Sequence, residues 1–259
     1  MLVIVTAGVT FPSKNNFLKV LCEKHPEITT IVQNINDRRT SMVLGKRNIV
    51  LKGKGYIEDV LCGCRFRISP TSFYQINHQQ TEKLYKKAIQ LADISKNDTV
   101  IDAYCGIGTI SLFMSKFAKE VYGVEIVDEA IVAAKENACI NNVTNTKFIA
   151  GDVEKVLDDL VNVKKIIPDI IMLDPPRRGL DNTSIENIRK VSPKKVVYIS
   201  CNPATLVRDL AKLEDIYNIK SIKPVDMFPF TSSVECCAVL ESVSYTHLTL
   251  PDDLIGVDL

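Results

Sequence analysis

Residues 99–125, TVIDAYCGIGTISLFMSKFAKEVYGVE, decide the fold expected for this chain. A strand pattern over 99–102 leads into a turn with two glycines, Gly106 and Gly108. A helical pattern over 110–116 and a second strand pattern over 121–124 follow. Glycines between a strand and a helix allow a tight turn and a close approach of the backbone to a ligand. This order predicts an α/β unit with parallel strands.

The same alternation of strands and helices continues on both sides of this stretch. Asn77 is a candidate N-cap for a helix whose inner face is formed by Leu84, Ala88 and Leu91. Two late strands, 219–223 and 235–240, have no helical pattern between them and are expected to form an antiparallel hairpin at the sheet edge. The remaining candidates are a helix over 130–141 and strands over 146–149, 170–173 and 196–200. We therefore predict a doubly wound, seven-stranded and mostly parallel sheet.

The two ends of the chain differ from this middle region. Residues 1–68 contain short β segments around one helix that starts after Ser13, so we expect a small partial α+β segment there. Within it, 65–68 alternates as a solvent-exposed strand would. We expect the catalytic domain to span 69–241. Residues 242–259 show no periodicity and are expected to be a disordered tail that is foreign to the gene.

The composition is that of an ordinary soluble globular protein, with 46% hydrophobic and 24% charged residues. The net charge of +1 gives no evidence of its own for a polyanionic partner. Eight irregularly spaced cysteines favour free thiols in a cytoplasmic protein. Cys62 and Cys64 form a Cys-x-Cys, but no second pair follows at metal-ligand spacing, so we expect no metal. We also expect no membrane association and a monomer.

The glycine turn and the acids after the next strands favour a nucleoside-containing cofactor. Glu125 ends the second strand about 20 residues further on, where an acid can hold ribose hydroxyls. Asp152 follows the third strand and is a candidate acceptor for an adenine amino group. The Gly-x-Gly-x-x-Gly fingerprint is incomplete and no P-loop is present. These features resemble the S-adenosylmethionine site of class I, Rossmann-like methyltransferases; the alternative is a simple turn with a solvated acid.

Asp174 and Cys201 mark the ends of two further strands. Two prolines after Asp174 fix the backbone, so that the acid is presented in one orientation. Arg177 and Arg178 follow where a base-stacking aromatic stands in amino-methyltransferases, which argues against an exocyclic amine as target; these arginines are candidates for phosphate contacts. Cys201 becomes a nucleophile only as a thiolate, which nearby positive charge or a helix N-terminus favours. Glu235 enters an apolar strand, which is unusual for an acid unless it faces a cleft.

Five segments together resemble the RNA (uracil-5-)-methyltransferases, the bacterial 23S rRNA enzymes and their tRNA relative. The matching segments are FYQIN at 73–77, DAYCG at 102–106, DPPR at 174–177, SCNP at 200–203 and VEC at 234–236. The resemblance implies S-adenosylmethionine contacts from Gln75, Tyr104, Glu125 and Asp174. It also implies a cysteine nucleophile at Cys201 and a base at Glu235. Family members add the cysteine to uracil C6, methylate C5 and then remove the C5 proton.

The resemblance covers 69–240 and leaves three other questions open. Full-length members carry an N-terminal β-barrel and, in many, an iron–sulfur cluster, so we expect this chain to be a truncated product without that cluster. The residues after Cys201 and after the two prolines favour 23S rRNA over tRNA as partner. An amino-methyltransferase and a non-catalytic RNA-binding remnant are the alternatives, and the first needs no thiol.

Overall fold

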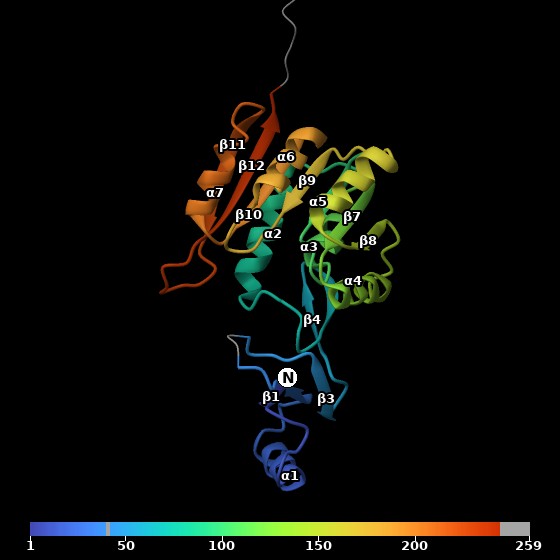
Figure 1. Cartoon of the computed structure of the whole chain (residues 1–259), viewed down its shortest axis with the longest axis vertical. Helices are drawn as coiled ribbons and strands as arrows, with labels where there is room; N and C mark the ends of the chain where they lie inside the picture. Colours follow the sequence, from blue (N-terminus) through green and yellow to red (C-terminus); the bar gives the residue numbers. More distant parts are fainter. Residues whose placement is uncertain (40–41, 244–259) are drawn as a thin grey trace, which may run out of the picture.

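The computed structural model describes residues 1–39 and 42–243, and its main body is a seven-stranded sheet (Figure 1). The strand order is β11-β12-β10-β9-β6-β7-β8. The strands are β6 (Thr99–Ala103), β7 (Glu120–Glu125), β8 (Thr146–Ala150), β9 (Ile170–Leu173), β10 (Lys195–Ser200), β11 (Tyr217–Val225) and β12 (Glu235–Ser242). Strands β6 to β10 pair in parallel, whereas β12 lies antiparallel between β10 and β11. The predicted seven-stranded, mostly parallel sheet with its antiparallel hairpin is confirmed.

Helices cover both faces of this sheet because its strands are apolar on both sides. In β10, Val197 and Ile199 belong to the core that includes α2, α3 and α4, whereas Val196 and Tyr198 face the core under α5, α6 and α7. Such alternation is the two-residue period of a strand. The helices are α2 (His78–Ala92), α3 (Thr109–Met114), α4 (Asp128–Ile140), α5 (Val153–Asp158), α6 (Asn182–Val191) and α7 (Pro203–Leu210), and a π-helical turn η1 (Asp159–Val163) follows α5.

Helix α2 forms where the sequence predicts it. The Asn77 side chain accepts a hydrogen bond from the backbone of Gln80, which is the expected N-cap. Leu84 and Ala88 are fully buried, and Leu91 packs against the same core while staying partly exposed. Burial of this face orients α2 so that its N-terminal end, and the segment before it, lie beside the edge where the parallel strands end.

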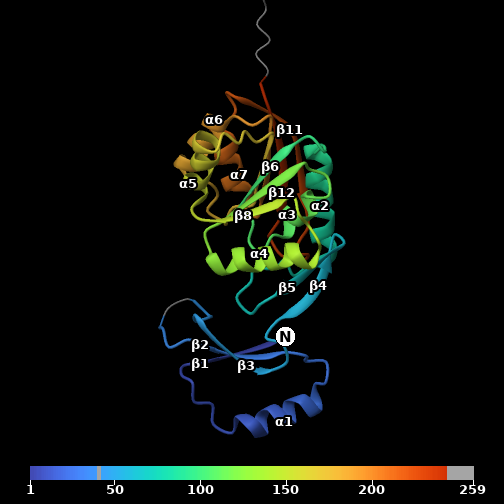
Figure 2. The ribbon, with the colours of Figure 1, turned by 90° about the vertical axis from the view of Figure 1, so that its right-hand side faces the viewer.

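A smaller sheet lies at the other end of the molecule. Its strands are β1 (Leu2–Thr6), β2 (Ile31–Ile35) and β3 (Arg47–Lys52), and α1 (Lys14–Lys24) connects β1 to β2. Figure 2 shows α1 on the side of this sheet that faces away from the main body. Ser13 is the N-cap of α1, but its side chain makes no capping hydrogen bond. No residue of α1 is buried, so this helix contributes little to a core.

The hairpin of β4 (Ile57–Leu61) and β5 (Cys64–Ile68) packs on the main body, not in solvent. Phe66 is fully buried, and the amides of Arg65 and Arg67 donate to the side chains of Asn141, the C-cap of α4, and of Asn137 on α4 (2.8 Å each). The expectation of an exposed strand over 65–68 was therefore wrong, because α4 offers this strand both apolar contacts and hydrogen-bond partners. Packing joins the hairpin to α3 and α4, so contacts of the main body begin before residue 69, the expected start of the catalytic domain. The division into domains stays a prediction.

The end of the chain is described as far as residue 243. Ser242 is the last residue of β12 and so does not belong to a tail, and the amide of Val243 donates to the carbonyl of Ile216. The rest of the expected tail, 244–259, lies outside the described residues. Within the described ranges, every helix is too short or too polar to cross a lipid bilayer.

Candidate active site

The register of the parallel strands brings the predicted cofactor residues to one edge of the sheet. Strands β6 and β9 end opposite each other, so Tyr104 and Asp174, the residues that follow them, become neighbours. Glu125 is the last residue of β7, one position beyond the last pair that β7 forms with β6. In α/β sheets, ligands bind outside the carboxyl ends of the strands. These three side chains therefore occupy the position where a ligand is expected.

The antiparallel register of β10 and β12 places the thiol opposite the acid. Ser200 pairs with Cys236, so one further step sets Cys201 opposite Glu235. Because β12 runs antiparallel to β10, the start of β12 meets the end of β10. An acid at the beginning of the last strand thus reaches the same edge as the acids at the ends of β7 and β9.

A cavity of about 570 Å³ opens at this edge, and all seven predicted site residues line it. They are Gln75, Tyr104, Glu125, Asp152, Asp174, Cys201 and Glu235. Other residues that the sequence did not assign to a cofactor or catalytic role complete the wall. Among them are Phe73, Glu154, Arg177, Arg178, Asp181, Ser184 and Phe228. The volume lies in the range of small-ligand and cofactor sites.

The glycine turn presents open backbone to this cavity. Gly106 has a positive φ of 54°, and a Cβ there would meet no atom within 4 Å. Gly108, with φ 84°, is crowded instead, because a Cβ would lie 3.0 Å from the ring of Phe148. Glu125 fixes the turn by accepting from the amide of Gly106 (3.2 Å) and from the amide of Val127 (3.0 Å). One glycine is thus required for packing, and the other leaves room for a ligand.

The segment with Gln75 is held from two sides. The Tyr74 hydroxyl donates to Asp59 on β4 (3.1 Å), and the Asn77 amide donates to the carbonyl of Met227 (2.9 Å). Met227 lies in the loop between β11 and β12, just before Phe228 of the cavity wall. These contacts tie Gln75 to the β4–β5 hairpin and to the loop that carries the aromatic residues.

Asp152 has a structural contact as well as a place in the cavity. It is the N-cap of α5 and accepts from the amide of Glu154 (3.0 Å). An N-cap acid after the third strand satisfies the helix terminus whether or not a ligand is bound. The assignment of Asp152 to an adenine amino group therefore stays a prediction.

Burial raises the pKa values of three carboxyl groups, those of Asp102, Asp174 and Glu235. Burial, together with the Glu235 and Asp102 carboxylates, raises the pKa of Asp174 to about 8. Burial raises the pKa of Asp102 to about 7 and also raises the pKa of Glu235. The Ser111 hydroxyl donates to Asp102, whose second oxygen has no hydrogen-bond partner among the described residues. Such a group of acids favours a bound cation.

Cys201 lies between opposing electrostatic influences. Its pKa is raised by partial burial and by the Glu235 carboxylate, whereas the Arg177 guanidinium lowers it. The same guanidinium lowers the pKa of Glu235. Arg177 therefore favours the ionised form of both groups, and the sequence had indicated this residue only as a candidate phosphate contact.

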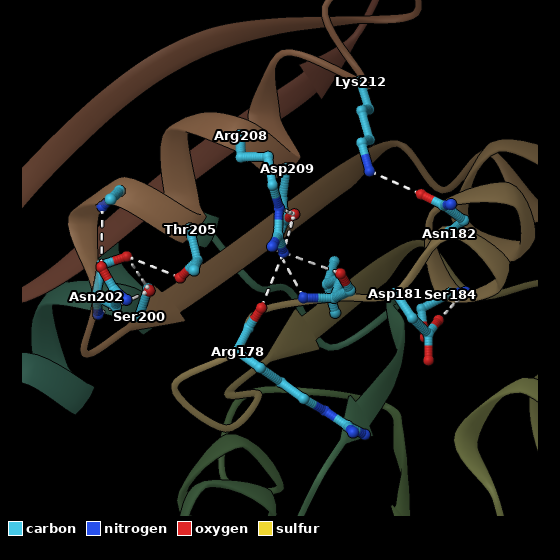
Figure 3. A network of polar contacts seen from close by, with 12 residues as sticks. Arg178, Asp181, Asn182, Ser184, Ser200, Asn202, Thr205, Arg208, Asp209 and Lys212 are labelled. Carbon is cyan, nitrogen blue, oxygen red and sulfur yellow. Dashed lines mark hydrogen bonds and ion pairs between the residues drawn. The ribbon is translucent and has the colours of Figure 1, made fainter.

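A polar network behind the cavity fixes the loop after β9 (Figure 3). Asp209 on α7 is fully buried and accepts from the amide of Leu180 and the hydroxyl of Tyr198 (2.8 Å each). Arg208 pairs with Asp209 and donates to the carbonyls of Arg178 (2.9 Å) and Leu180 (3.1 Å). Because α7 starts two residues after Cys201, this network joins the Asp-Pro-Pro loop to the cysteine turn.

No sequence signal singled out the Arg208–Asp209 pair, because both residues lie inside an ordinary helical pattern. Asp102 stood in a quoted motif, but only the structure shows that it is buried beside Asp174. Residues 1–39 and 42–243 contain no group of three or more His, Cys, Asp or Glu arranged to hold a metal ion. Cys62 and Cys64 flank Gly63 in the turn of the β4–β5 hairpin.

Comparison with known proteins supports the class that this fold suggests. The strand order and the loops gathered at one carboxyl edge define a Rossmann-like methyltransferase fold, which a methyltransferase from Streptococcus mutans shares at a TM-score of 0.61 and 11% identity. The sequence profile of the tRNA (Uracil-5-)-methyltransferase family matches residues 43–243, and the chain belongs to this family.

Individual relatives cover nearly the whole chain. An uncharacterized RNA methyltransferase of Oceanobacillus iheyensis is 50% identical over 241 residues, which are 93% of this chain and 52% of that protein. One of Bacillus cereus is 47% identical over 244 residues, 94% of this chain and 53% of that protein. The crystal structure of Pyrococcus abyssi tRNA (uracil-54, C5)-methyltransferase with S-adenosyl-L-homocysteine has a TM-score of 0.73 and 30% identity, over 92% of this chain and 55% of that one. The chain thus spans about half the length of these relatives.

Proposed function

We propose that this chain carries the catalytic centre of an S-adenosylmethionine-dependent methyltransferase that modifies C5 of uracil in RNA through a covalent adduct with Cys201. The observation that carries this proposal is the cavity that Cys201, Glu235 and the cofactor candidates line together. Family membership supports the reaction, and the archaeal structure with S-adenosyl-L-homocysteine supports the cofactor.

The cavity suits S-adenosylmethionine, which supplies an electrophilic methyl group from a positively charged sulfonium. Glu125, Asp152 and Asp174 provide carboxylates for hydroxyl, amino and sulfonium groups, and the open backbone at Gly106 allows a close approach. Burial, and to a smaller extent neighbouring carboxylates, raises the pKa of Asp174 and of Asp102, so a bound cation would favour their ionised forms. Gln75 and Tyr104 complete the proposed contacts on the remaining sides.

Cys201 starts the proposed reaction, because C5 of uracil is itself a weak nucleophile. The Cys201 thiolate forms a bond to C6, and the electrons of the C5–C6 double bond move to the O4 enolate. C5 then accepts the methyl group as the carbon–sulfur bond of the donor breaks. Arg177 favours the required thiolate electrostatically.

Glu235 completes the cycle as the base. It removes the proton from the methylated C5, the C5–C6 double bond forms again, and the bond between Cys201 and C6 breaks. A carboxylate whose pKa is raised by burial accepts a proton at neutral pH better than an exposed one. Asp174 lies close enough for the Glu235 carboxylate to raise its pKa, and we assign Asp174 to positioning the cofactor or the uracil.

The proposed substrate is a uridine outside a stacked helix, since Cys201 needs access to the C6 atom of an unstacked base. The segments after Asp174 and Cys201 favour 23S rRNA, whereas the family profile and the archaeal structure are named for tRNA. Separate methylation assays of this chain on the two RNAs distinguish these substrates.

Trapping on RNA that contains 5-fluorouridine tests the mechanism. The fluorine at C5 cannot leave as a proton, so we expect a stable adduct whose mass includes protein, RNA and the transferred methyl group. Cys201→Ala should form none, whereas Cys139→Ala, which changes an exposed cysteine on α4, should behave as wild type. An adduct that survives Cys201→Ala would refute the assignment of the nucleophile. Methyl transfer that persists without this thiol would instead favour the amino-methyltransferase alternative.

A further inference from the structure

A second groove, of about 380 Å³, lies between α2 and the end of β11 and contains three lysines, Lys83, Lys87 and Lys223. We propose that this groove, the lysine groove, binds the phosphate backbone of the RNA strand beside the target uridine. The inference rests on the proposed function and identifies the surface that would hold the substrate.

The lysines of this groove carry charge that the protein does not neutralise. Within 1–39 and 42–243, Lys83 and Lys223 form no ion pair, and Lys87 donates only to the side-chain amide of Gln90 (3.2 Å). Asp226 is the one acid among the lining residues that the structure describes. Two net positive charges therefore remain at this surface, although the whole chain has a net charge of only +1.

Another lysine-lined groove on the same molecule has the opposite property. Lys194, Lys195 and Lys220 line it, and each lies near a carboxylate at 2.7, 3.8 and 3.1 Å, respectively. Lysines on protein surfaces commonly acquire such partners, which reduce their attraction for an external anion. The contrast indicates that the lysine groove is available for a polyanion, whereas the groove lined by Lys194, Lys195 and Lys220 is not.

The lysine groove adjoins the catalytic cavity through two shared chain segments. Gln75 and Phe228 line the cavity, whereas Gln80 and Asp226, a few residues away on the same segments, line the groove. The hydrogen bond from Asn77 to Met227 holds the two segments together between these sites. A strand that places one uridine in the cavity therefore has a direct path along the groove.

Phosphate contacts of this kind position a strand and do not read its sequence. Each phosphate that a lysine neutralises on single-stranded RNA releases counterions. The logarithm of the association constant therefore falls with the logarithm of the salt concentration, with a slope of about 0.7 per contact. Three contacts thus contribute a slope of about 2. Salt dependence gives a signature that loss of folding or loss of the cofactor site does not reproduce.

The test measures binding of a short, fluorescently labelled oligouridylate to the full chain at several salt concentrations. The variant Lys83→Gln/Lys87→Gln/Lys223→Gln should bind roughly 10- to 100-fold more weakly at low salt and lose about 2 units of slope. The matched control Lys190→Gln/Lys194→Gln/Lys220→Gln removes three exposed lysines elsewhere and should keep the wild-type slope. Equal salt slopes for the two triple variants would overturn the proposal, and this is the result expected if the groove binds a protein partner. A wild-type chain that binds no RNA would also overturn it.

The same oligonucleotide with 5-fluorouridine separates this inference from the proposed function. At saturating RNA, the groove variant should still form the Cys201 adduct, and its affinity for S-adenosylmethionine should match that of wild type. Loss of slope without any adduct in wild type would refute the mechanism and keep the groove. If wild type forms the adduct but the groove variant keeps the wild-type salt slope, the mechanism stands and the groove proposal is refuted.

Discussion

The two halves of the catalytic cavity differ in charge and in how the protein holds them. The half formed by the ends of β6, β7 and β8 is acidic, with Glu125 and Asp152 bonded to backbone amides. The half formed by the loop that carries Arg177, the end of β10 and the start of β12 combines Cys201 and Glu235 with the Arg177 cation, and Asp174 at the end of β9 lies between the two halves. A network from α7 holds its loops. This division matches a cationic cofactor on one side and an anionic reaction intermediate on the other.

Such a division also separates binding from chemistry in experimental terms. Changes in the acidic half should alter cofactor affinity and leave covalent attack on uracil possible. Changes in the other half should alter attack or release and leave cofactor affinity intact. Variants that change cofactor affinity and the covalent steps equally would show that the two halves act as one unit.

The largest effect among these variants is expected from Glu235→Gln. Without a base, the methylated C5 retains its proton, so turnover should fall by roughly 10²- to 10⁴-fold while the adduct accumulates on ordinary uridine RNA. Denaturing gel electrophoresis detects the adduct, and calorimetry should give an unchanged affinity for S-adenosylmethionine. Glu241→Gln, near the far end of β12, is the matched control. Normal turnover of Glu235→Gln would remove this residue from the base role.

Glu125→Gln tests the acidic half. A hydrogen bond to a charged group contributes about 1.5–3 kcal/mol, so KM for S-adenosylmethionine should rise by roughly 10- to 100-fold. At saturating cofactor, kcat should remain near that of wild type. Glu129→Gln, an exposed acid in the first turn of α4, should change neither parameter. A fall in kcat at unchanged KM would place Glu125 in the chemistry and contradict the division.

Arg208→Leu tests whether the α7 network supports the catalytic half. The change leaves Asp209 buried without its cation and frees the carbonyls of Arg178 and Leu180, so unfolding should require about 2 kcal/mol less free energy. We expect kcat to fall about 10-fold with little change in KM for the cofactor. Arg189→Leu removes a surface pair with Asp215 and should cost about 1 kcal/mol or less in urea unfolding. If kcat falls equally in both variants, the network has no specific role.

Much of this division could be predicted from the sequence, because it depends on which residues end each strand. Alternating strands and helices fix where the carboxyl edge lies, and Glu125, Asp174 and Cys201 directly follow or end a strand. The supporting contacts could not be predicted in this way. Asp209 resembles any acid within a helix until the tertiary fold buries it against Leu180 and Tyr198, which lie 29 and 11 residues away in the sequence.

The hairpin of β4 and β5 illustrates the same limit in the fold. An alternating strand pattern does not reveal whether its apolar face meets a helix or solvent. Here Asn137 joins the amide of Arg67 to the carbonyl of Ile107 in the glycine turn, a bridge of 70 and 30 residues along the chain. Only packing of α4 against both segments creates this contact. Errors in the sequence interpretation thus lie where long-range contacts decide.

The smallest effect is expected in the pH dependence of attack by Cys201. Its pKa is raised by burial and by Glu235, so the thiolate fraction is small at neutral pH and the rate of adduct formation should rise with pH until that pKa is passed. Arg177 opposes this shift, so Arg177→Met should raise the pKa of Cys201, move the rise in rate to higher pH and slow attack at pH values below that rise. The readout is the adduct rate on saturating 5-fluorouridine RNA across pH. Arg178→Met is the matched control, because Arg178 acts electrostatically on Tyr104 and Asp181. If the pH at which the adduct rate rises shifts equally in both variants, the cause is a general loss of positive charge. That result would refute a specific role for Arg177 in stabilising the thiolate.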